Sequence, residues 1–384
     1  MKRRNLLISA GLIVLFVALY GLFAASPSKN QIKFYVGSSG NQAHAIYLCE
    51  MSPQTLEFTL LDSFSGAEGA SYLALSPGKE FLFCNSRTPA EPGNHMSAVS
   101  SFQIHPRTKQ LEFLSSKPSM GQGNCHVHCS QDGKYLFAAN YNSGHAAAFP
   151  LDKQGNIGDA VAVVRGKGSG PVENRQQGPH AHQVVLDPGQ NFLLVPDLGT
   201  DKVMIYQFFK ESGSLAPHPV KGSFSLAPGA GPRHLVFHPD GAWLYIVNEL
   251  NSTLTAGSWD AEKGALAEIQ TLSTVEEGHR GMKYPAAVRM HPSGKYVYAS
   301  TRGENSCIST FSVQKDGSLH RIQVMEDVPL WPRDFNIDPT GRWLIAAGER
   351  ANEIRLYAID PETGKLSDTG STKKLSAPAC IAFL

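Results

Sequence analysis

The sequence predicts an all-β fold: a seven-bladed β-propeller, closed by a blade shared between N- and C-terminal strands and preceded by one N-terminal hydrophobic helix. The first observation behind this is a glycine-containing turn that recurs six times. Strand repeats of about 40 to 50 residues are typical of propeller blades, because each blade buries its faces against its neighbours. The turn glycines follow one another at intervals of 47 to 56 residues: Gly78, Gly133, Gly189, Gly241, Gly294 and Gly341.

The second observation is that a short strand pattern stands on each side of every turn. Before the turn, apolar residues alternate as in 72–75, which indicates a strand with one strongly buried side. After the turn comes a run of aromatic or aliphatic residues, as in 81–83, and such residues favour strands. The other five pairs of segments are 126–129 with 135–137, 183–186 with 192–194, 234–237 with 243–245, 287–290 with 296–298, and 334–337 with 343–345.

The third observation is an unpaired strand at the C-terminus. Residues 379–383 match the first strand of a blade, but no turn or second strand follows them. Segments 33–36, 45–49 and 56–61 would supply the missing strands, so the two chain ends would share a seventh blade and close the ring. Closure removes exposed strand edges. An open β-solenoid is the alternative, but its repeats are usually shorter and it would not need a split unit.

The composition suits a large, turn-rich β domain without a nucleic-acid partner. The chain has 384 residues with 36 Gly and 24 Pro, and only 17% of its residues are charged. A nucleic-acid-binding surface normally shows as concentrated basic charge, whereas the formal net charge is +1. The sequence indicates no particular oligomeric state.

The N-terminus predicts export. Residues 1–30 would form a membrane anchor or signal segment with a short linker, and residues 31–384 the propeller. The apolar run from Leu6 to Ala25 is long enough to span a bilayer, and the basic residues before it favour a cytoplasmic N-terminus. The propeller would then lie on the extracytoplasmic, periplasmic side, anchored to the inner membrane. Small residues at 24–26 leave cleavage and secretion as the alternative.

Six cysteines invite a disulfide or metal interpretation, which the spacing does not favour. Their positions are irregular and several lie in apolar strands, so we expect mostly buried free thiols. The run Cys125-His126-Val127-His128-Cys129 resembles a metal cluster. On a regular strand both cysteines would face one side and both histidines the other, so the four could not converge on one ion. We therefore expect no metal site.

Polar residues are predicted to gather at one mouth of the propeller channel. The first strand of each blade lines the channel, and the antiparallel second strand ends at the rim where the first begins. His182, Arg233 and Arg333 stand at the starts of first strands. Glu249 and Arg302 stand at the ends of second strands. Such convergence at a concave opening predicts a ligand site.

Four more residues near this rim are candidates for substrate binding: His126, His180, Arg175 and His234. A single Arg or Glu near a strand end is usually a solvated rim residue, and a lone His is usually a hydrogen-bonded structural group. The concentration of such residues in the third to sixth blades favours a functional role instead.

Several short motifs carry a resemblance to a known family. They are Arg175-Gln176 with Gly178-Pro179-His180-Ala181-His182, then 196–201, 229–235, 248–250 and 301–303. In this order they are similar to the seven-bladed lactonase family, which contains propeller-type 6-phosphogluconolactonase and carboxy-cis,cis-muconate lactonizing enzyme. The resemblance runs from about residue 33 to the C-terminus. It implies a site of one His, two Arg and one Glu, which fall on His182 (alternatively His180), Arg233, Arg302 and Glu249.

These residues predict a metal-independent lactone hydrolase that needs no cofactor and acts on a sugar-derived or other anionic lactone. His182 would take a proton from the attacking water, and Glu249 would orient His182 or act as the base itself. Arg233 and Arg302 would bind a carboxylate or phosphate and stabilise the oxyanion. No Gly-x-Ser-x-Gly motif between a strand and a helix indicates a serine nucleophile.

Three other functions remain open. The chain could be a lactonizing cycloisomerase that runs related chemistry in the opposite direction. It could be a membrane-tethered binding or scaffold propeller without catalysis, because propellers carry many functions and sugar-phosphate lactones are expected in the cytoplasm. A quinone-dependent propeller dehydrogenase is the third, although no sequence feature requires the cofactor.

Overall fold

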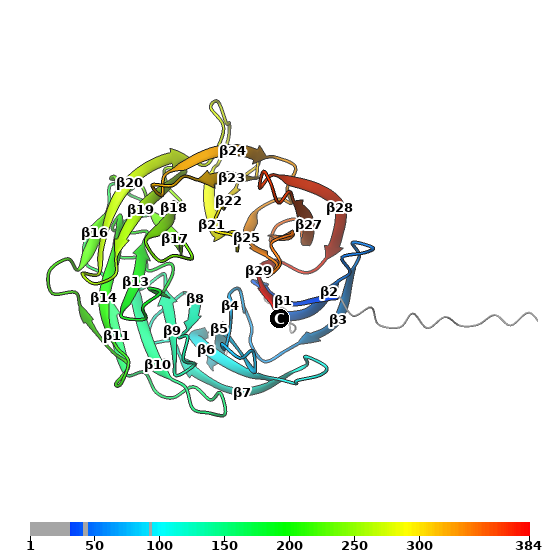
Figure 1. Cartoon of the computed structure of the whole chain (residues 1–384). Helices are drawn as coiled ribbons and strands as arrows, with labels where there is room; N and C mark the ends of the chain where they lie inside the picture. Colours follow the sequence, from blue (N-terminus) through cyan, green and yellow to red (C-terminus); the bar gives the residue numbers. More distant parts are fainter. Residues whose placement is uncertain (1–30, 41–44, 92–93) are drawn as a thin grey trace, which may run out of the picture.

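Seven antiparallel sheets stand around a central axis in the computed structural model, which describes residues 31–40, 45–91 and 94–384 (Figure 1). The described residues form strands, turns and loops without a helix. The prediction of an all-β seven-bladed propeller is confirmed. The predicted hydrophobic helix at Leu6 to Ala25 lies outside the described residues. Within those residues, no helix is long and apolar enough to cross a membrane.

Blades 1 to 6 follow one another along the chain, and each runs from an inner strand at the channel to an outer strand. Blades 1 to 3 contain β4(Leu73–Leu75), β5(Phe81–Glu91), β6(Asn94–Ile104) and β7(Leu111–Pro118); β8(Asn124–Cys129), β9(Tyr135–Asn140), β10(His145–Pro150) and β11(Ala162–Arg165); and β12(Val185–Leu186), β13(Phe192–Asp197), β14(Lys202–Phe209), β15(Ser214–Pro217) and β16(Ser223–Ser225). Blades 4 to 6 contain β17(Pro232–Phe237), β18(Trp243–Asn248), β19(Thr253–Asp260) and β20(Ala265–Ser273); β21(Tyr284–Met290), β22(Tyr296–Arg302), β23(Cys307–Val313) and β24(Leu319–Met325); and β25(Pro332–Ile337), β26(Trp343–Gly348), β27(Glu353–Ile359) and β28(Leu366–Lys374).

Blade 7 is built from both ends of the described chain. Its inner strand is β29(Pro378–Phe383), which pairs antiparallel with β1(Ile32–Ser38). In this register Phe34 lies opposite Phe383 and Val36 opposite Ile381. The sheet continues through β2(Ile46–Met51) to β3(Phe58–Phe64). The first and last strands thus lie side by side and close the ring (Figure 1).

Apolar layers between adjacent blades hold the ring together. Phe137 of blade 2 packs in one cluster with Leu193 of blade 3, and Tyr298 of blade 5 packs with Phe335 of blade 6. All four side chains are fully buried. Burying one such side chain stabilises the fold by about 1.5 to 3 kcal/mol, so these layers fix each blade against its neighbours.

In four of the six turns the recurring glycine itself has a positive φ, and in the other two the residue after it does. Gly133 and the glycines of the turns at 241, 294 and 341 have φ of 70° to 76°, in the left-handed region. In the turns of Gly78 and Gly189 that conformation falls instead on the next residue, Lys79 with φ 58° or Gln190 with φ 55°. The glycine spacing therefore finds every turn, but the equivalent backbone position shifts where another residue tolerates a positive φ.

A β-bulge interrupts the mouth end of the inner strand in several blades. In blade 4, Pro232 pairs with Asn248 and His234 pairs with Val247, so Arg233 has no partner in the register. The same irregularity leaves out Cys125, Arg333 and Ala379 in blades 2, 6 and 7. A bulge re-aims the extra side chain and increases the local twist. We call the positions of these four residues the bulge positions.

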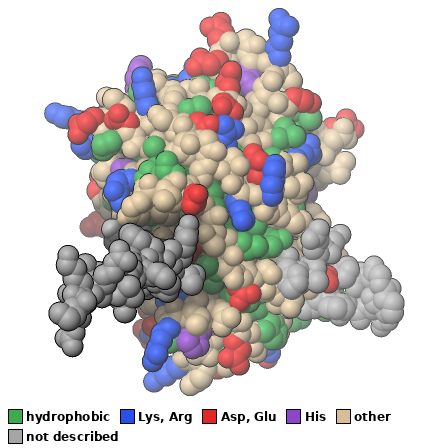
Figure 2. All heavy atoms as spheres, turned by 90° about the vertical axis from the view of Figure 1, so that its right-hand side faces the viewer, with side chains coloured by type: hydrophobic (Ala, Val, Ile, Leu, Met, Phe, Trp, Pro, Cys, Tyr) green, Lys and Arg blue, Asp and Glu red, His purple; other side chains and the backbone are tan. Residues whose placement is uncertain are grey.

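The flank of the molecule shown in Figure 2 carries basic and acidic side chains that are interspersed. This mixture agrees with the formal net charge of +1. On this flank no broad surface of one sign is visible.

Candidate active site

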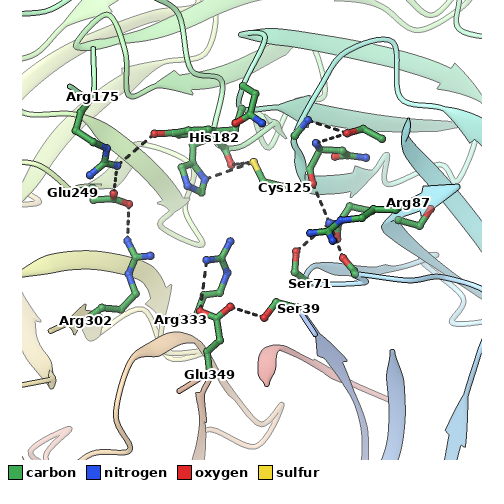
Figure 3. Close-up of a pocket in the computed structure, with 18 residues that line it drawn as sticks. Ser39, Ser71, Arg87, Cys125, Arg175, His182, Glu249, Arg302, Arg333 and Glu349 are labelled. Atoms are coloured by element: carbon green, nitrogen blue, oxygen red, sulfur yellow. Dashed lines mark hydrogen bonds and ion pairs between the residues drawn. The ribbon is translucent and has the colours of Figure 1, made fainter. Parts of the chain in front are cut away.

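A pocket of about 500 Å³ opens at the mouth of the channel that the bulges face (Figure 3). Five of the predicted site residues line it: Arg175, His182, Glu249, Arg302 and Arg333. They come from the loop before β12, from the ends of β18 and β22, and from the bulge of β25. Ser39, Ser71, Arg87, Cys125, Tyr141 and Glu349 line the pocket as well.

Glu249 is the centre of the charged network. Its Oε1 accepts a hydrogen bond from Arg175 Nη2 at 2.5 Å. Its Oε2 accepts hydrogen bonds from Arg233 Nε at 3.0 Å and from Arg302 Nη2 at 2.6 Å. One carboxylate at the end of β18 thereby holds arginines from the loop before blade 3 and from blades 4 and 5.

Burial and charge act against each other in this network. Burial alone would raise the pKa of Glu249, but Arg302 and Arg233 hold it well below its ordinary value. Burial lowers the pKa of Arg233 to about 9, with a further lowering by Arg302 and an opposing effect of Glu249. Glu249 is therefore an ionised counter-ion, and a carboxylate with this pKa is a poor proton acceptor.

Arg233 lies below the pocket rather than in its wall. Only 2% of its side chain is exposed. Besides Glu249, its guanidinium donates to the Ala286 carbonyl oxygen at 2.5 Å and lies 3.3 Å from His234 Nε2. It borders a small cavity underneath the pocket. The geometry thus places Arg233 as the support of Glu249, whereas Arg302 reaches the pocket directly.

His182 presents a neutral imidazole to the pocket. Burial and the neighbouring Arg233 lower its pKa well below the ordinary value, and Glu249 only partly opposes this. Its Nδ1 lies 3.8 Å from the Cys125 sulfur. Burial raises the pKa of Cys125 to about 11, so this cysteine is a protonated thiol. The neutral ring has a free nitrogen for a proton, and an anionic ligand bound beside it would raise its pKa and so strengthen it as a proton acceptor.

Two buried polar side chains fix the loops that carry the arginines. Gln176 is fully buried, and its amide nitrogen donates to the Leu198 carbonyl oxygen at 2.8 Å and to Asp201 Oδ1 at 2.7 Å. Asp201 in turn accepts hydrogen bonds from the backbone N–H groups of Gly229 at 2.7 Å and Gly231 at 2.8 Å. This chain joins the loop of Arg175 to the loop that leads into Arg233.

His180 is held behind the pocket wall. Its backbone N–H donates to Asp197 Oδ1 at 2.7 Å, and its ring stacks on Tyr141 with centroids 4.5 Å apart. The nearby Gly199 allows a very close approach, because a Cβ there would lie 1.8 Å from the Gly178 carbonyl oxygen. His180 does not line the pocket, which favours His182 as the functional histidine of the motif.

Arg333 has fewer polar contacts than Arg175 and Arg302. Its Nη1 lies 3.7 Å from Glu349 Oε2, and 26% of its side chain is exposed. Within the described residues, no hydrogen bond engages its guanidinium. Glu349 also accepts a hydrogen bond from Ser39 Oγ at 2.5 Å, which links blade 6 to blade 7. Arg333 therefore has N–H donors available for a ligand.

His126 and His234 lie deeper, on the channel axis. Each is 3% exposed, and their ring centroids are 5.4 Å apart. The His126 ring also packs on Tyr72 at 3.9 Å, and His234 packs against His182 at 5.4 Å. The structure thus brings both histidines close to the site without placing them in the pocket wall.

The side chains of the Cys-His-Val-His-Cys run do not converge on one point. The expectation that its two cysteines face the same side of the strand is wrong. Cys125 and Cys129 do not share a face: Cys125 packs against a cluster with blade 3, and Cys129 packs against a cluster with blade 1. The cause is the bulge between Asn124 and His126, which breaks the strand alternation. All six cysteines are free thiols. The described residues contain no cluster of His, Cys, Asp and Glu suited to a metal ion.

A search of protein families identifies this architecture. The model of the lactonase family of seven-bladed β-propellers matches residues 33–383. The chain belongs to this lactonase family. It is 32% identical over 315 residues to 6-phosphogluconolactonase of Bacillus subtilis, covering 82% of this chain and 87% of that protein. It is 28% identical over 364 residues to 6-phosphogluconolactonase of Pectobacterium atrosepticum, covering 94% and 98%.

Solved structures agree with this lactonase-family assignment. The periplasmic gluconolactonase of Pseudomonas aeruginosa superposes with a TM-score of 0.86 at 25% sequence identity. The similarity covers 92% of this chain and 99% of that protein.

Sequence reasoning missed part of the lactonase-family pocket. It did not select Tyr141, which lies beside Arg175 at 3.4 Å, or Glu349, which faces Arg333. Both stand at the ends of second strands, at the positions equivalent to Glu249 and Arg302. The blade alignment contained this signal, but polar type alone did not show which of these side chains turn inward.

Proposed function

We propose that this protein hydrolyses an anionic lactone in the pocket. The observation that carries the proposal is the charge of the site. Arg175, Arg233, Arg302 and Arg333 meet two carboxylates, Glu249 and Glu349, and this leaves excess positive charge beside a neutral His182. Such a pocket attracts an anion and holds a proton acceptor in its wall. Membership of the lactonase family supports the reaction class.

The reaction would proceed by attack of water on the lactone carbonyl carbon. His182 would accept a proton from the water as its oxygen forms the new C–O bond. The carbonyl oxygen would become an oxyanion, which arginine N–H groups stabilise. The ring C–O bond would then break, and the proton held by His182 would pass to the departing ring oxygen. The product is the open-chain hydroxy acid.

The contacts of each arginine indicate whether it would bind the substrate or position another side chain. Arg302 and Arg333 line the pocket, so they would meet the oxyanion or an anionic substituent of the substrate. Arg233 is buried and already contacts Glu249, His234 and the Ala286 carbonyl oxygen, so it would position Glu249. The low pKa of Glu249 supports a role as counter-ion over a role as base. His126 and His234 lie beneath the pocket, so they would support its wall and would not contact the substrate.

Sugar-derived lactones are the first substrates to test, because the relatives are named 6-phosphogluconolactonase and gluconolactonase. Ring opening of 6-phosphoglucono-δ-lactone and glucono-δ-lactone should be followed by acid release at constant pH, above the spontaneous rate. We expect turnover by the wild type and a loss of at least about 100-fold in His182→Ala and Arg302→Gln.

Surface substitutions of the same residue types serve as controls. His320→Gln changes an exposed side chain on the outer strand β24, and Arg107→Gln changes one in the turn between β6 and β7; both variants should retain full turnover. Full turnover in His182→Ala would overturn the assignment of this histidine. Binding without ring opening across the lactone panel would favour the scaffold function. Ring closure of an unsaturated acid by addition of its carboxylate across the C=C bond, without loss of water, would favour a cycloisomerase.

We also propose that the domain is exported, as the segment Leu6 to Ala25 predicts. The similarity to a periplasmic gluconolactonase supports this location. A fusion of residues 1–40 to alkaline phosphatase, which folds only after export, should be active. An inactive fusion would contradict export, and the size of the mature chain on a membrane fraction would distinguish an anchor from a cleaved leader.

A further inference from the structure

A small cavity lies beneath the pocket, and two buried side chains that line it, His234 and Asp334, have no step in the proposed reaction. The centre of a water molecule can move within a volume of only about 10 Å³ there, so the cavity has room for about one water molecule. Ser71, Cys125 and Arg333 border both this cavity and the pocket, and Tyr72 borders both the cavity and the opposite mouth of the channel. The cavity thus lies on the channel axis between the two mouths.

Two side chains that line this cavity carry polar atoms without a partner. His234 is 3% exposed and Asp334 is 1% exposed. Within the described residues, His234 Nδ1 and Asp334 Oδ2 have no hydrogen-bond partner. Buried polar atoms nearly always have one, and a lone buried acceptor or donor costs about 1 to 3 kcal/mol. Two such atoms at one small cavity indicate a common ligand.

The other bonds of these side chains define what each atom offers. His234 Nε2 lies 3.3 Å from Arg233 Nη1, and a guanidinium can only donate, so Nε2 accepts and the ring proton resides on Nδ1. Asp334 Oδ1 accepts from Arg289 Nη2 at 2.7 Å, and the Cys380 thiol is a further, weak donor to this carboxylate, so Oδ2 keeps a lone pair for a stronger donor. The cavity therefore presents one N–H donor and one carboxylate acceptor.

The surrounding charges exclude most other small ligands. Arg233 and Arg333 border the cavity, so a metal cation would be repelled. A chloride ion is larger than a water molecule and would lie against the Asp334 carboxylate, so neither the volume nor this side of the cavity suits it. A neutral molecule that both donates and accepts fits, and the volume admits only one of the size of water.

We infer that one water molecule is bound beneath the active-site pocket between His234 Nδ1 and Asp334 Oδ2, and that it holds His234 and Arg233 in position. The hydrogen-bonded path then runs from Arg289 through Asp334, water, His234 and Arg233 to Glu249. It links the inner strands of blades 4, 5 and 6. His234 and Asp334 are thus positioning residues. The water site does not depend on the proposed function, because these contacts exist whatever the substrate.

A high-resolution crystal structure of the full-length protein tests the water site directly. We expect an ordered water within hydrogen-bond distance of both His234 Nδ1 and Asp334 Oδ2. ¹⁵N NMR of the histidine rings should show the Nδ1–H tautomer for His234. A cavity without ordered density, a direct His234–Asp334 hydrogen bond or the Nε2–H tautomer would overturn the inference.

Replacement of His234 tests the positioning role. His234→Phe removes both ring nitrogens, so the water should be lost and the Arg233 guanidinium should shift from Glu249 in the crystal structure. With an active lactone substrate we expect kcat to fall about tenfold with little change in KM, because Arg233 does not line the pocket. An unmoved Arg233 in His234→Phe would overturn the positioning role. Failure of the lactone assay with the water present would affect only the proposed function.

Discussion

Substitution of Glu249 by glutamine tests whether one carboxylate holds the arginines of the pocket together. Glutamine has almost the same shape, so the change creates no cavity and removes only the negative charge. Arg233 Nε and Arg302 Nη2 then face a neutral oxygen at 3.0 and 2.6 Å, and the amide N–H₂ group meets Arg175 donor to donor. We expect the folded state to lose stability because buried positive charges lose their counter-ion.

The contacts allow the magnitude to be worked out. The side chains of Glu249, Arg233 and Arg302 are only 6%, 2% and 7% exposed, and removal of one partner from such a buried network costs about 3 to 5 kcal/mol. The Arg175 side chain is 32% exposed, so its pair adds less than about 1 kcal/mol. We therefore expect the free energy of unfolding to fall by about 3 to 5 kcal/mol in Glu249→Gln.

Urea unfolding at neutral pH, followed by tryptophan fluorescence, measures this change. Trp331 is a suitable reporter, because the Arg302 guanidinium lies 5.5 Å from its ring. Glu349→Gln is the matched control: its ion pair with Arg333 spans 3.7 Å, and the substitution should cost less than about 1 kcal/mol. Sulfate should restore stability more in Glu249→Gln than in the wild type, since an anion can replace the carboxylate. Equal losses in the two variants would refute the reasoning.

Three further predictions concern acid stability, a backbone contact and the thiols. Burial lowers the pKa of His126, His182 and His234, so below about pH 6.5 the unfolded chain takes up protons that the folded chain does not. Stability should therefore fall on acidification by up to about 1.4 kcal/mol per histidine and pH unit, and equal urea midpoints at pH 7.5 and 5 would contradict this. Gly199→Ala should destabilise by at least about 1 to 3 kcal/mol because its Cβ would meet a carbonyl oxygen, whereas Gly178→Ala, with open space around its Cβ, should leave the melting temperature nearly unchanged. In the native protein a thiol reagent should label the four buried cysteines far more slowly than in urea, since burial raises the pKa of each, and rapid labelling of all six in the native state would refute this.

The fold could be predicted because its signals are local. Each turn needs a residue with positive φ, and each flanking strand needs apolar side chains, so the repeat is readable in the amino-acid types. The two exceptions, Lys79 and Gln190, moved the equivalent position by one residue without hiding the turn. The number of blades followed from the unpaired segment at 379–383.

The site could be predicted only as a set of residues near one rim. Glu249 and Arg302 were found because they end second strands. The division between Arg302 in the wall and Arg233 beneath it depends on the bulge and on hydrogen bonds between blades, which no local pattern encodes. Likewise, the alternation expected for Cys125 failed at a bulge that no residue type announces.

The bulges have a consequence for how the pocket can change. Cys125, Arg233, Arg333 and Ala379 occupy the same backbone position in four blades, yet this position holds a thiol, two guanidinium groups and a methyl group. A residue that is left out of the strand register contributes little to the pairing of its sheet, so its side chain can be exchanged without unpairing the blade. The bulge positions can therefore carry different side chains on one backbone, provided that side-chain contacts such as those of Arg233 with Glu249 are replaced. Substitutions at the bulge positions are therefore the first to consider for adapting the pocket to a substrate of different charge on the same fold.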